Sequence, residues 1–262
     1  MSDNADLELI RLLEELGGNA TGPVSTETTQ MLEGWRLRAA PGAPFRRANS
    51  VLPLYSHHTP LGRRLEEVER FYAGLGLPAR YQLSPAAQPP ELDGVLEQRG
   101  YRYDAPVGVF VADTGIVSER TAGGTITISS EIEDEWHDEY AAAHGDDDVT
   151  RSRLLAYGRL LRHLRPAVAA VVARTGEELV GIGLGVRERG WVGVYAMGTR
   201  PEARRRGAAR AVLHALAAWA QAGDADRMYL QVEESNPPAR GLYQAAGFRP
   251  LYRYWYRVER AT

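Results

Sequence analysis

The sequence predicts an α/β (α+β) protein of 262 residues made of two tandem units. Apolar residues alternate along the chain between the 3.6-residue spacing of helices and the two-residue spacing of strands. The two halves repeat one order of elements, and the stretch 113–125 between them has three glycines and no apolar periodicity. We therefore expect domains at 1–115 and 126–262, joined by a linker at 116–125.

The first half opens with an amphipathic helix at 6–16, which Gly17 and Gly18 should end. A second helix at 60–75 has proline in its first turn, where the missing N–H costs nothing. The other elements expected in this half are strands at 34–40, 48–54 and 79–83, a proline-rich loop at 84–90, a helix at 91–100 and a strand at 101–112.

The second half begins with a strand at 126–129, followed by two helices at 134–143 and 150–164. The remaining elements are expected, in order, as strands at 167–173, 179–186 and 191–197, a strongly apolar helix at 206–222, a strand at 227–232, a helix at 237–246 and a strand at 251–258.

A shift of 147 positions places the first half on the second. Arg80 then falls on Arg227, and the helix that begins at 60 falls on the helix that begins at Gly207. Strand, helix, strand, helix and strand stay in register over about 80 residues. This agreement indicates the duplication of one α/β unit.

Composition excludes several kinds of chemistry. The chain has no cysteine, and all 31 of its Lys+Arg residues are arginine. A thiol nucleophile, a disulfide, a thiolate metal site, a Schiff base on lysine and a phosphate loop that needs lysine are therefore excluded. A net charge of −3 argues against nucleic-acid binding, and no apolar run approaches the length of a membrane helix. The acidic, polar stretch 1–16 is unlike a signal peptide, so we expect a cytoplasmic protein.

The stretch 195–209 is the most informative for function, because a strand runs into a short turn that opens a helix. The first amide groups of a helix have no partner inside it, and with the helix dipole they form a site for anions. Gly207 and Ala209 leave the backbone accessible, and three arginines before them add charge and paired donors. These residues indicate a pyrophosphate site, and the alternative is a solvated basic start of a helix.

Two patterns in the second half resemble the GCN5-related N-acetyltransferase (GNAT) family. Arg204-x-x-Gly207-x-Ala209 is similar to the family's R/Q-x-x-G-x-G/A loop, and the segment from Asn236 to Phe248 resembles its N-x-x-A-x-x-L-Y-x-x-x-G-F pattern. The spacing of the two patterns and the order of the preceding strands agree as well. The resemblance spans 126–258 and implies tandem GNAT-like domains, each with a mixed, mostly antiparallel sheet flanked by helices.

This resemblance implies acetyl-CoA as co-substrate and no metal ion. In the family, acetyl-CoA lies where two central parallel strands separate, and the matching strands here are 191–197 and 227–232. Its arm would pair with the backbone of Met197, Gly198 and Thr199, and the amide of Met197 would hold the oxyanion. Its pyrophosphate would lie on Arg204, Arg205, Arg206, Gly207, Ala208 and Ala209.

Tyr243 matches the family's tyrosine that protonates the departing thiolate, and the alternative is an aromatic residue of the core. Asn236 would bind the cofactor arm or cap its helix. The base that takes the amine's proton is not identified by the motif. Glu233 and Glu234, at the end of a strand beside the proposed site, are the best candidates, unless both are only solvated.

The first half lacks the residues that this chemistry needs. At the three matching positions it has Pro60, Pro89 and Leu96 in place of the glycine, the asparagine and the tyrosine. Pro60 has no N–H and places a ring where the phosphate would lie. The first half is therefore expected to be a degenerate copy that supports the fold or forms one side of the acceptor site.

Two weaker signals stay open. Nine acids and no arginine lie between 131 and 148, and they would either attract a cationic amine or form a solvated face: Glu131, Glu133, Asp134, Glu135, Asp138, Glu139, Asp146, Asp147 and Asp148. Gly181, Gly183 and Gly185 share one face of a strand and would leave room for a ligand or for a packed helix.

We expect an acetyl-CoA-dependent N-acetyltransferase that transfers acetyl directly to a primary amine of a small molecule or a peptide. The alternatives are a non-catalytic CoA-binding or sensing protein and an acetyltransferase of the mycothiol-biosynthesis type. Expected partners are the amine acceptor and, for assembly, a second copy in a homodimer, with no nucleic acid and no membrane.

Overall fold

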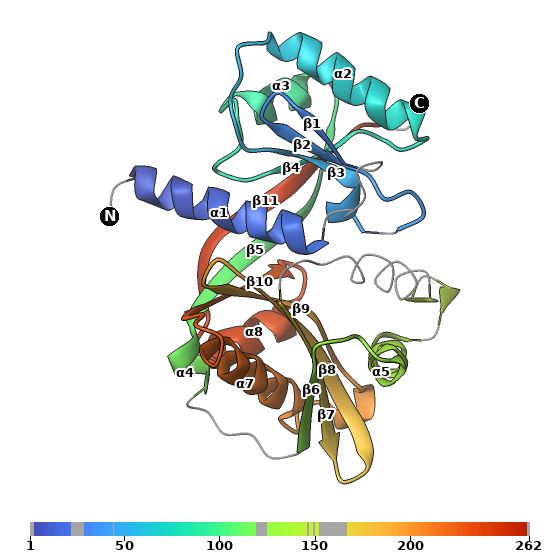
Figure 1. The fold of residues 1–262 in the computed structure, drawn as a ribbon. Coiled ribbons are helices and arrows are strands. Elements are labelled where there is room, and N and C mark those ends of the chain that lie inside the picture. Colours follow the sequence, from blue (N-terminus) through green and yellow to red (C-terminus); the bar gives the residue numbers. More distant parts are fainter. Residues whose placement is uncertain are drawn as a thin grey trace. The chain divides into compact units, whose positions relative to one another are not determined.

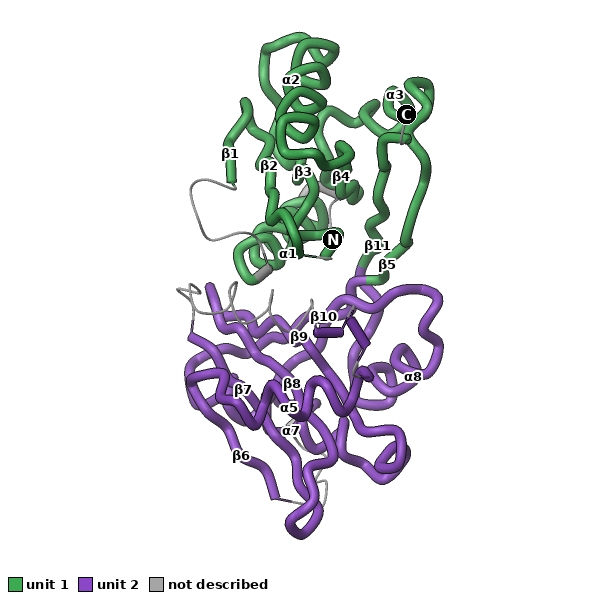
Figure 2. Tube along the Cα trace, turned by 90° about the vertical axis from the view of Figure 1, so that its right-hand side faces the viewer, with its two compact units in different colours: residues 1–108, 252–262 green, residues 109–251 purple. Residues whose placement is uncertain are grey.

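The computed structural model describes residues 3–21, 29–43, 45–118, 125–145, 147–148, 150–151 and 167–260, and it confirms the predicted α/β class (Figure 1). The chain forms two compact units, as Figure 2 shows. Unit 1 comprises residues 1–108 and 252–262, and unit 2 comprises residues 109–251. Among the described residues, no helix is long and apolar enough to cross a membrane.

Unit 1 has the strand order β1-β2-β3-β4-β11-β5. Strands β1 to β3 are antiparallel, β3 and β4 are parallel, and β4 and β11 are antiparallel. The elements are α1 (Asp3–Thr21), β1 (Thr29–Leu32), β2 (Trp35–Arg38), the 3-10 helix η1 (Arg47–Asn49), β3 (Ser50–Pro53), α2 (Leu61–Gly74), β4 (Arg80–Leu83), α3 (Leu92–Gln98), most of β5 (Arg102–Asp113) and most of β11 (Arg249–Val258).

Unit 2 continues the strand order as β5-β10-β9-β8-β7-β6, antiparallel from β6 to β9 and parallel between β9 and β10. Its elements are α4 (Thr114–Ser118), β6 (Thr125–Ser129), α5 (Asp134–His144), β7 (Ala167–Thr175), β8 (Glu178–Glu188), β9 (Trp191–Thr199), the 3-10 helix η2 (Pro201–Ala203), α7 (Ala208–Gln221), β10 (Arg227–Glu233) and α8 (Pro237–Ala245). The helix predicted at 150–164 lies, beyond residue 151, outside the described residues.

The two units are not the two halves of the sequence. Strand β11 pairs with β4, so residues 252–258 complete unit 1, although the whole stretch 126–262 was expected in the second domain. Strand β5 lies next to β10, so residues 109–113 belong to unit 2. The C-terminal part of each half's last strand thus belongs to the other unit, an arrangement that periodicity cannot reveal. The expected linker at 116–125 also contains the end of α4.

The repeat seen in the sequence recurs in the elements. Helices α2 and α7 each have 14 residues and begin 147 positions apart, at Leu61 and Ala208. Strands β4 and β10 begin at the same separation, and so do β5 and β11. Pro60 and Gly207 therefore hold the same position, the residue that precedes each helix.

One part of the repeat departs from this separation. In unit 1, Val51 of β3 pairs with Tyr81 of β4. The residue of β10 that matches Tyr81 is Met228, and it pairs with Val192, which is only 141 positions after Val51. The segment between the paired strand and the helix is thus six residues longer in unit 2. The additional length lies in the stretch before α7 that carries the predicted cofactor residues.

The first helix is longer than predicted. Helix α1 continues through Gly17 and Gly18 to Thr21. A Cβ atom at Gly18 would lie 3.2 Å from Leu52 Cδ2 and 3.5 Å from Arg38 Nη1, so this glycine packs closely on β2 and β3. Tertiary contacts continue the helix past residues that would end it in isolation.

The three glycines of β8 make room for a helix. A Cβ at Gly183 would lie 2.4 Å from Val212 Cγ1, and one at Gly185 would lie 2.7 Å from Leu216 Cδ2. Both neighbours are buried residues of α7, which covers this face of the sheet, while α5 covers the other face at Gly198 (Figure 1). The packed-helix alternative therefore accounts for these glycines.

Gly183→Ala is expected to lower the free energy of unfolding by about 1–3 kcal/mol, the usual cost of overpacking a core. Val212 is β-branched and fully buried, so it cannot move aside easily. The measurement is urea denaturation followed by circular dichroism. Gly241→Ala in α8, where a Cβ meets nothing within 4 Å, is the matched control and should be neutral or slightly stabilising. Equal stability of Gly183→Ala and the unmodified chain would contradict the close packing of α7.

Candidate functional site

The central parallel strands of unit 2 stop pairing partway along their length. Pairing of β9 with β10 ends at Val194 and Leu230, although β9 continues to Thr199 and β10 to Glu233. On its other side, β9 has a register shift against β8, where Ala196 and Met197 have no Cα partner. Ala196 has a φ of 48°, as expected of a bulge. The structure thus places the predicted residues Met197, Gly198 and Thr199 where β9 no longer pairs with β10.

The turn between β9 and α7 has the backbone geometry of an anion site. Gly207 precedes α7 with a φ of 94°, and a Cβ there would meet nothing within 4 Å. Arg205 also has a positive φ, of 64°. The first turn of α7 has no side-chain cap. The first helical hydrogen bond of α7 is donated by the amide of Ala211 to the carbonyl of Gly207. The preceding amide groups are therefore available to a ligand.

The charged side chains of this turn are exposed. Arg204, Arg205 and Arg206 all face solvent, and Arg204 donates from Nε to the carbonyl of Thr199 at 3.4 Å. No residue of this turn is acidic after Glu202. Arginines beside a helix N-terminus favour the binding of phosphate groups. The residues present therefore fit a pyrophosphate in the predicted place.

An ion pair between a buried carboxylate and a partly exposed arginine holds the start of this turn, and it was not predicted from the sequence. Glu139 of α5 is fully buried and accepts a hydrogen bond from Arg200 Nε at 2.8 Å. Burial raises the pKa of Glu139, while Arg200 opposes that shift. The signal was present in the sequence, because Glu139 lies on the helix face that also carries Trp136, Tyr140 and Ala143, all buried.

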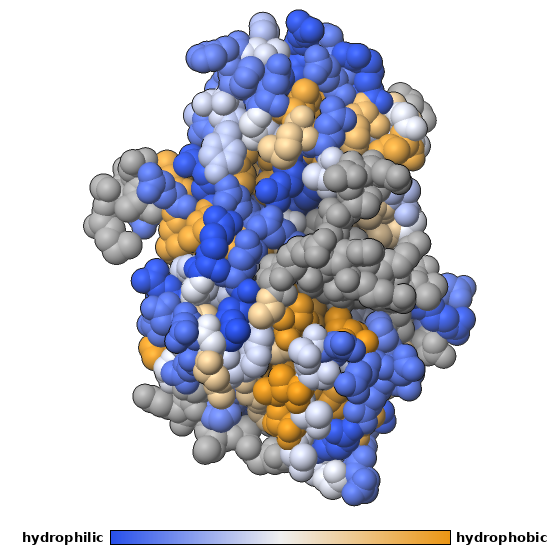
Figure 3. Space-filling view, in the orientation of Figure 1, coloured by the Kyte–Doolittle hydropathy of each residue, from blue (hydrophilic) through white to orange (hydrophobic). Residues whose placement is uncertain are grey.

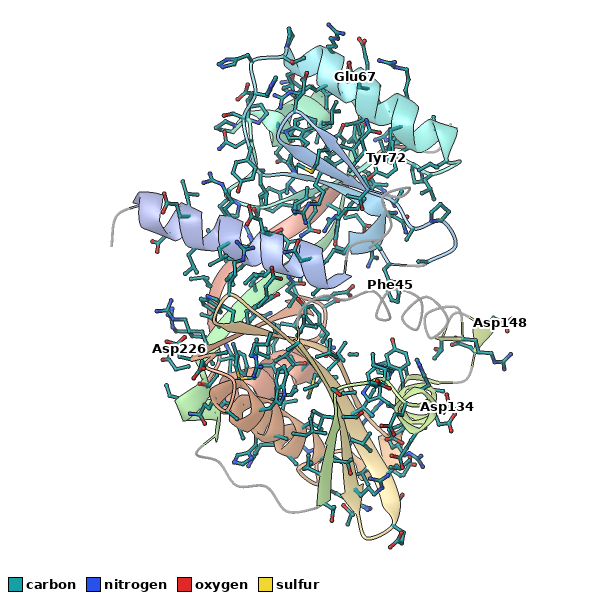
Figure 4. All side chains as sticks on the ribbon, in the orientation of Figure 1. Phe45, Glu67, Tyr72, Asp134, Asp148 and Asp226 are labelled. Atoms are coloured by element: carbon teal, nitrogen blue, oxygen red, sulfur yellow. The ribbon has the colours of Figure 1, made fainter. Side chains whose placement is uncertain are left out.

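Several acids of the segment around α5 pair with groups of the protein itself. Glu135 pairs with Arg174, Asp147 accepts from the amide of Thr150 at 2.7 Å, and Asp148 pairs with Arg151. The outer side of α5 is hydrophilic in Figure 3, and Asp134 and Asp148 lie at the outer edge of unit 2 in Figure 4. Asp146 lies outside the described residues. These contacts give the segment a structural role, and the attraction of a cationic amine stays a prediction.

Tyr243 has a buried ring and an exposed end. Its side chain is 7% exposed and packs edge-on against Phe248, with ring centroids 6.1 Å apart. Burial raises the pKa of Tyr243 to about 12. Within the described chain, its hydroxyl has no hydrogen-bond partner and is not among the buried unpaired atoms, so solvent reaches it. Tyr243 is in the same apolar cluster as Met197. The ring of Tyr243 is therefore part of the core, as the alternative interpretation expected, while its hydroxyl is free to donate a hydrogen bond to a ligand.

The other predicted residues lie at the junction of β10 and α8. Asn236 caps α8, because its Oδ1 accepts from the amide of Ala239 at 3.2 Å. Glu233 is exposed and accepts from Ser235 Oγ at 3.3 Å, and Glu234 is partly exposed. The capping role of Asn236 is therefore observed, and both carboxylates are accessible to solvent.

A polar group on β9 and β10 was not predicted. The hydroxyl oxygens of Tyr195 and Tyr229 lie 2.6 Å apart, and the neighbouring Gln231 has a buried side-chain amide without a hydrogen bond to any described residue. The alternation of apolar and polar residues along β10 was the only sequence signal for this group.

Comparison with known proteins adds a family and a fold. A family model described as "Probable histone acetyltransferase Rv0428c C-terminal" matches residues 9–257. The protein YobR of Bacillus subtilis (strain 168), described as an uncharacterized N-acetyltransferase, is 29% identical over 228 residues, which cover 86% of this chain and 90% of that protein.

Solved structures share the fold at low identity. A GCN5-related N-acetyltransferase from Kribbella flavida has a TM-score of 0.69 at 16% identity, with 96% of each chain covered. A tandem GNAT protein from the clavulanic acid biosynthesis pathway has a TM-score of 0.67 at 13% identity, covering 100% of this chain and 97% of that one.

Proposed function

This chain belongs to the family described as the probable histone acetyltransferase Rv0428c C-terminal domain and is an N-acetyltransferase with a tandem GNAT fold, and from this premise we propose that it transfers acetyl from acetyl-CoA directly to a primary amine. The observation that carries the proposal is the turn before α7. This turn fits a pyrophosphate, because it has backbone amides without a described partner, free space beside Gly207 and three arginines. Unit 1 has Pro60 at the matching position, so unit 2 is the proposed active unit.

The backbone of unit 2 would hold and polarise the co-substrate. Acetyl-CoA, when bound, supplies the acetyl group as a thioester. We assign the diphosphate to the turn from Arg204 to Ala209 and the pantetheine arm to the stretch from Met197 to Thr199, which no longer pairs with β10. The amide of Met197 is the proposed donor to the thioester carbonyl oxygen, since fixed donors stabilise charge that develops there.

Side chains at the end of β10 and on α8 would move the protons. The new bond joins the amine nitrogen to the acetyl carbon while the carbon–sulfur bond breaks. Tyr243 is the proposed acid that protonates the departing sulfur, and the exposed end of its side chain supports this role. Glu233 and Glu234 are the proposed acceptors of the amine's proton, directly or through water.

Direct transfer is supported by the composition. The chain has no cysteine, so it cannot form an acetyl-cysteine on its own thiol before transfer. The amine and acetyl-CoA would then have to be bound at the same time. We propose a small molecule or a peptide as the source of the amine, and the description of the family favours an amine on a polypeptide.

The test is release of free thiol from acetyl-CoA by the full chain, followed with a thiol reagent across aliphatic amines, amino-acid amides and peptides with free termini. The assay has no protein background, because the chain has no cysteine. Release that depends on an amine is expected. If acetyl-CoA raises the Tm but no amine on the panel gives release, the non-catalytic CoA-binding alternative replaces the enzyme proposal.

A further inference from the structure

The side-chain amide of Gln231 is buried and has no partner among the described residues. Its Nε2 and Oε1 are both inaccessible to solvent, and neither bonds to any residue that the structure describes. Buried amides are normally paired, since an unpaired donor or acceptor loses its bonds to water and gains nothing in return. A group with both atoms unpaired in the middle of a central strand therefore calls for a ligand that pairs with it.

Gln231 lies where the two central strands separate. It is the first residue of β10 after the last one paired with β9, Leu230. Leu230 and Val232 face the apolar core that α7 covers. Because side chains alternate along a strand, Gln231 lies on the opposite face, together with the candidate base Glu233. The amide of Gln231 is therefore on the face of β10 that carries the candidate base, two residues before it.

The residue of β9 beside Gln231 is Tyr195, and its hydroxyl contacts Tyr229. Continuing the parallel register places Tyr195 beside Gln231, but the Tyr195 hydroxyl lies 2.6 Å from that of Tyr229. Gly193 permits this arrangement, since a Cβ there would lie 2.6 Å from the Tyr195 ring and 2.7 Å from the Tyr229 ring. Both rings thus extend over Gly193, on the paired side of the separation point, and Gln231 keeps its unpaired amide.

We infer that Gln231 recognises an amide group of the acceptor, so that the acetylated amine stands next to an amide carbonyl. This inference rests on the proposed function of the same site. A glutamine presents one donor and one acceptor side by side on a planar group. A carboxylate offers only acceptors and an ammonium group only donors, whereas an amide offers both in the complementary order. The acceptor class is therefore an aminoacyl amide or the first residue of a peptide.

The test compares alaninamide with alanine methyl ester as acceptors for the full chain. The two have the same amine and nearly the same size, but the ester lacks the N–H that Gln231 Oε1 would accept. We expect kcat/KM to be roughly tenfold or more higher for the amide, because a site built to pair a polar group rejects a ligand that leaves it unpaired.

Gln231→Met tests the residue itself. It should bring the ratio of amide to ester close to one, and it should keep or raise the Tm because it removes a buried unpaired group. The shift of Tm on adding acetyl-CoA should stay as in the unmodified chain. Gln221→Met, the same change at an exposed residue at the end of α7, is the matched control and should leave the ratio unaltered.

The outcomes separate this inference from the proposed function. If the unmodified chain acetylates amide and ester equally, or if Gln231→Met leaves the ratio unaltered, the assignment of Gln231 is overturned while the acetyltransferase proposal stands. If no amine is acetylated at all, the proposed function fails and this inference fails with it. The comparison on the unmodified chain does not depend on the folding of any variant.

Discussion

Tyr243→Phe is expected to lower kcat by about 10²–10⁴-fold, the usual contribution of a positioned acid, and to leave the affinity for acetyl-CoA nearly unchanged. The hydroxyl has no hydrogen bond within the described residues, so its removal costs the fold little. The ring and its contact with Phe248 remain. A fall in kcat with an unaltered Tm would therefore report the loss of a proton donor.

The pH dependence sharpens the same expectation. Burial raises the pKa of Tyr243 to about 12. A tyrosine donates its proton only while it is protonated, which is the form that dominates below its pKa. The rate of the unmodified chain should therefore show no loss from ionisation of Tyr243 until about pH 11. Any fall at lower pH would be due to another group.

Tyr81→Phe is the matched control for Tyr243→Phe. Tyr81 lies in unit 1 and is fully buried, and its hydroxyl has no partner among the described residues, so the same atom is removed in the unit that lacks the proposed chemistry. Its kcat should equal that of the unmodified chain. If Tyr243→Phe turned over acetyl-CoA as fast as this control, Tyr243 would be a core residue and another group would be the acid.

Gly207→Pro should abolish the binding of acetyl-CoA, because it makes the turn of unit 2 resemble that of unit 1 at Pro60. Gly207 has a φ of 94°, whereas proline is held near −65°, so the turn would have to rebuild. The substitution also removes the amide and places a ring in the open space beside the backbone. The measurement is the rise in Tm on adding acetyl-CoA, which follows affinity and should disappear.

A pair of alanine substitutions separates ligand binding from backbone strain. Gly207 and Gly176 both have positive φ angles, of 94° and 60°, and a Cβ at either meets nothing within 4 Å. Each alanine should cost a similar ~1–2 kcal/mol of stability, since a Cβ is disfavoured in this conformation. Only Gly207→Ala should weaken acetyl-CoA binding. Equal binding by both variants, or tight binding by Gly207→Pro, would remove this turn from the site.

Much of the local structure was predictable because its signals act over a few residues. The offset of 147 between the two halves predicted the matching starts of α2 and α7, and the contiguous motif predicted the short turn that opens α7. The short strand β1 was missed because its four residues have no clear alternation. The six additional residues of unit 2 were hidden, since β3 and β9 end within one residue of matching positions while the residues that they pair do not match.

The candidate site divides in the same way. Its backbone part, the turn before α7, follows from a contiguous motif. Glu139 and Arg200, the contact of Gly183 with α7, and the unpaired amide of Gln231 depend on which segments come together in space. A sequence read one segment at a time predicts the faces of helices and strands but not the partners of their polar groups.

The sequence by itself determined that this protein repeats one α/β unit, that only its second half has the residues for a diphosphate site, and that no cysteine can take part. The tertiary structure decided that the end of each half's last strand joins the other unit, where the pairing of β9 with β10 ends, and which polar side chains there have no partner among the described residues. The physical reason is that turns and helix starts are set by neighbouring residues. The partner of a strand or a buried amide is instead set by competition among distant segments.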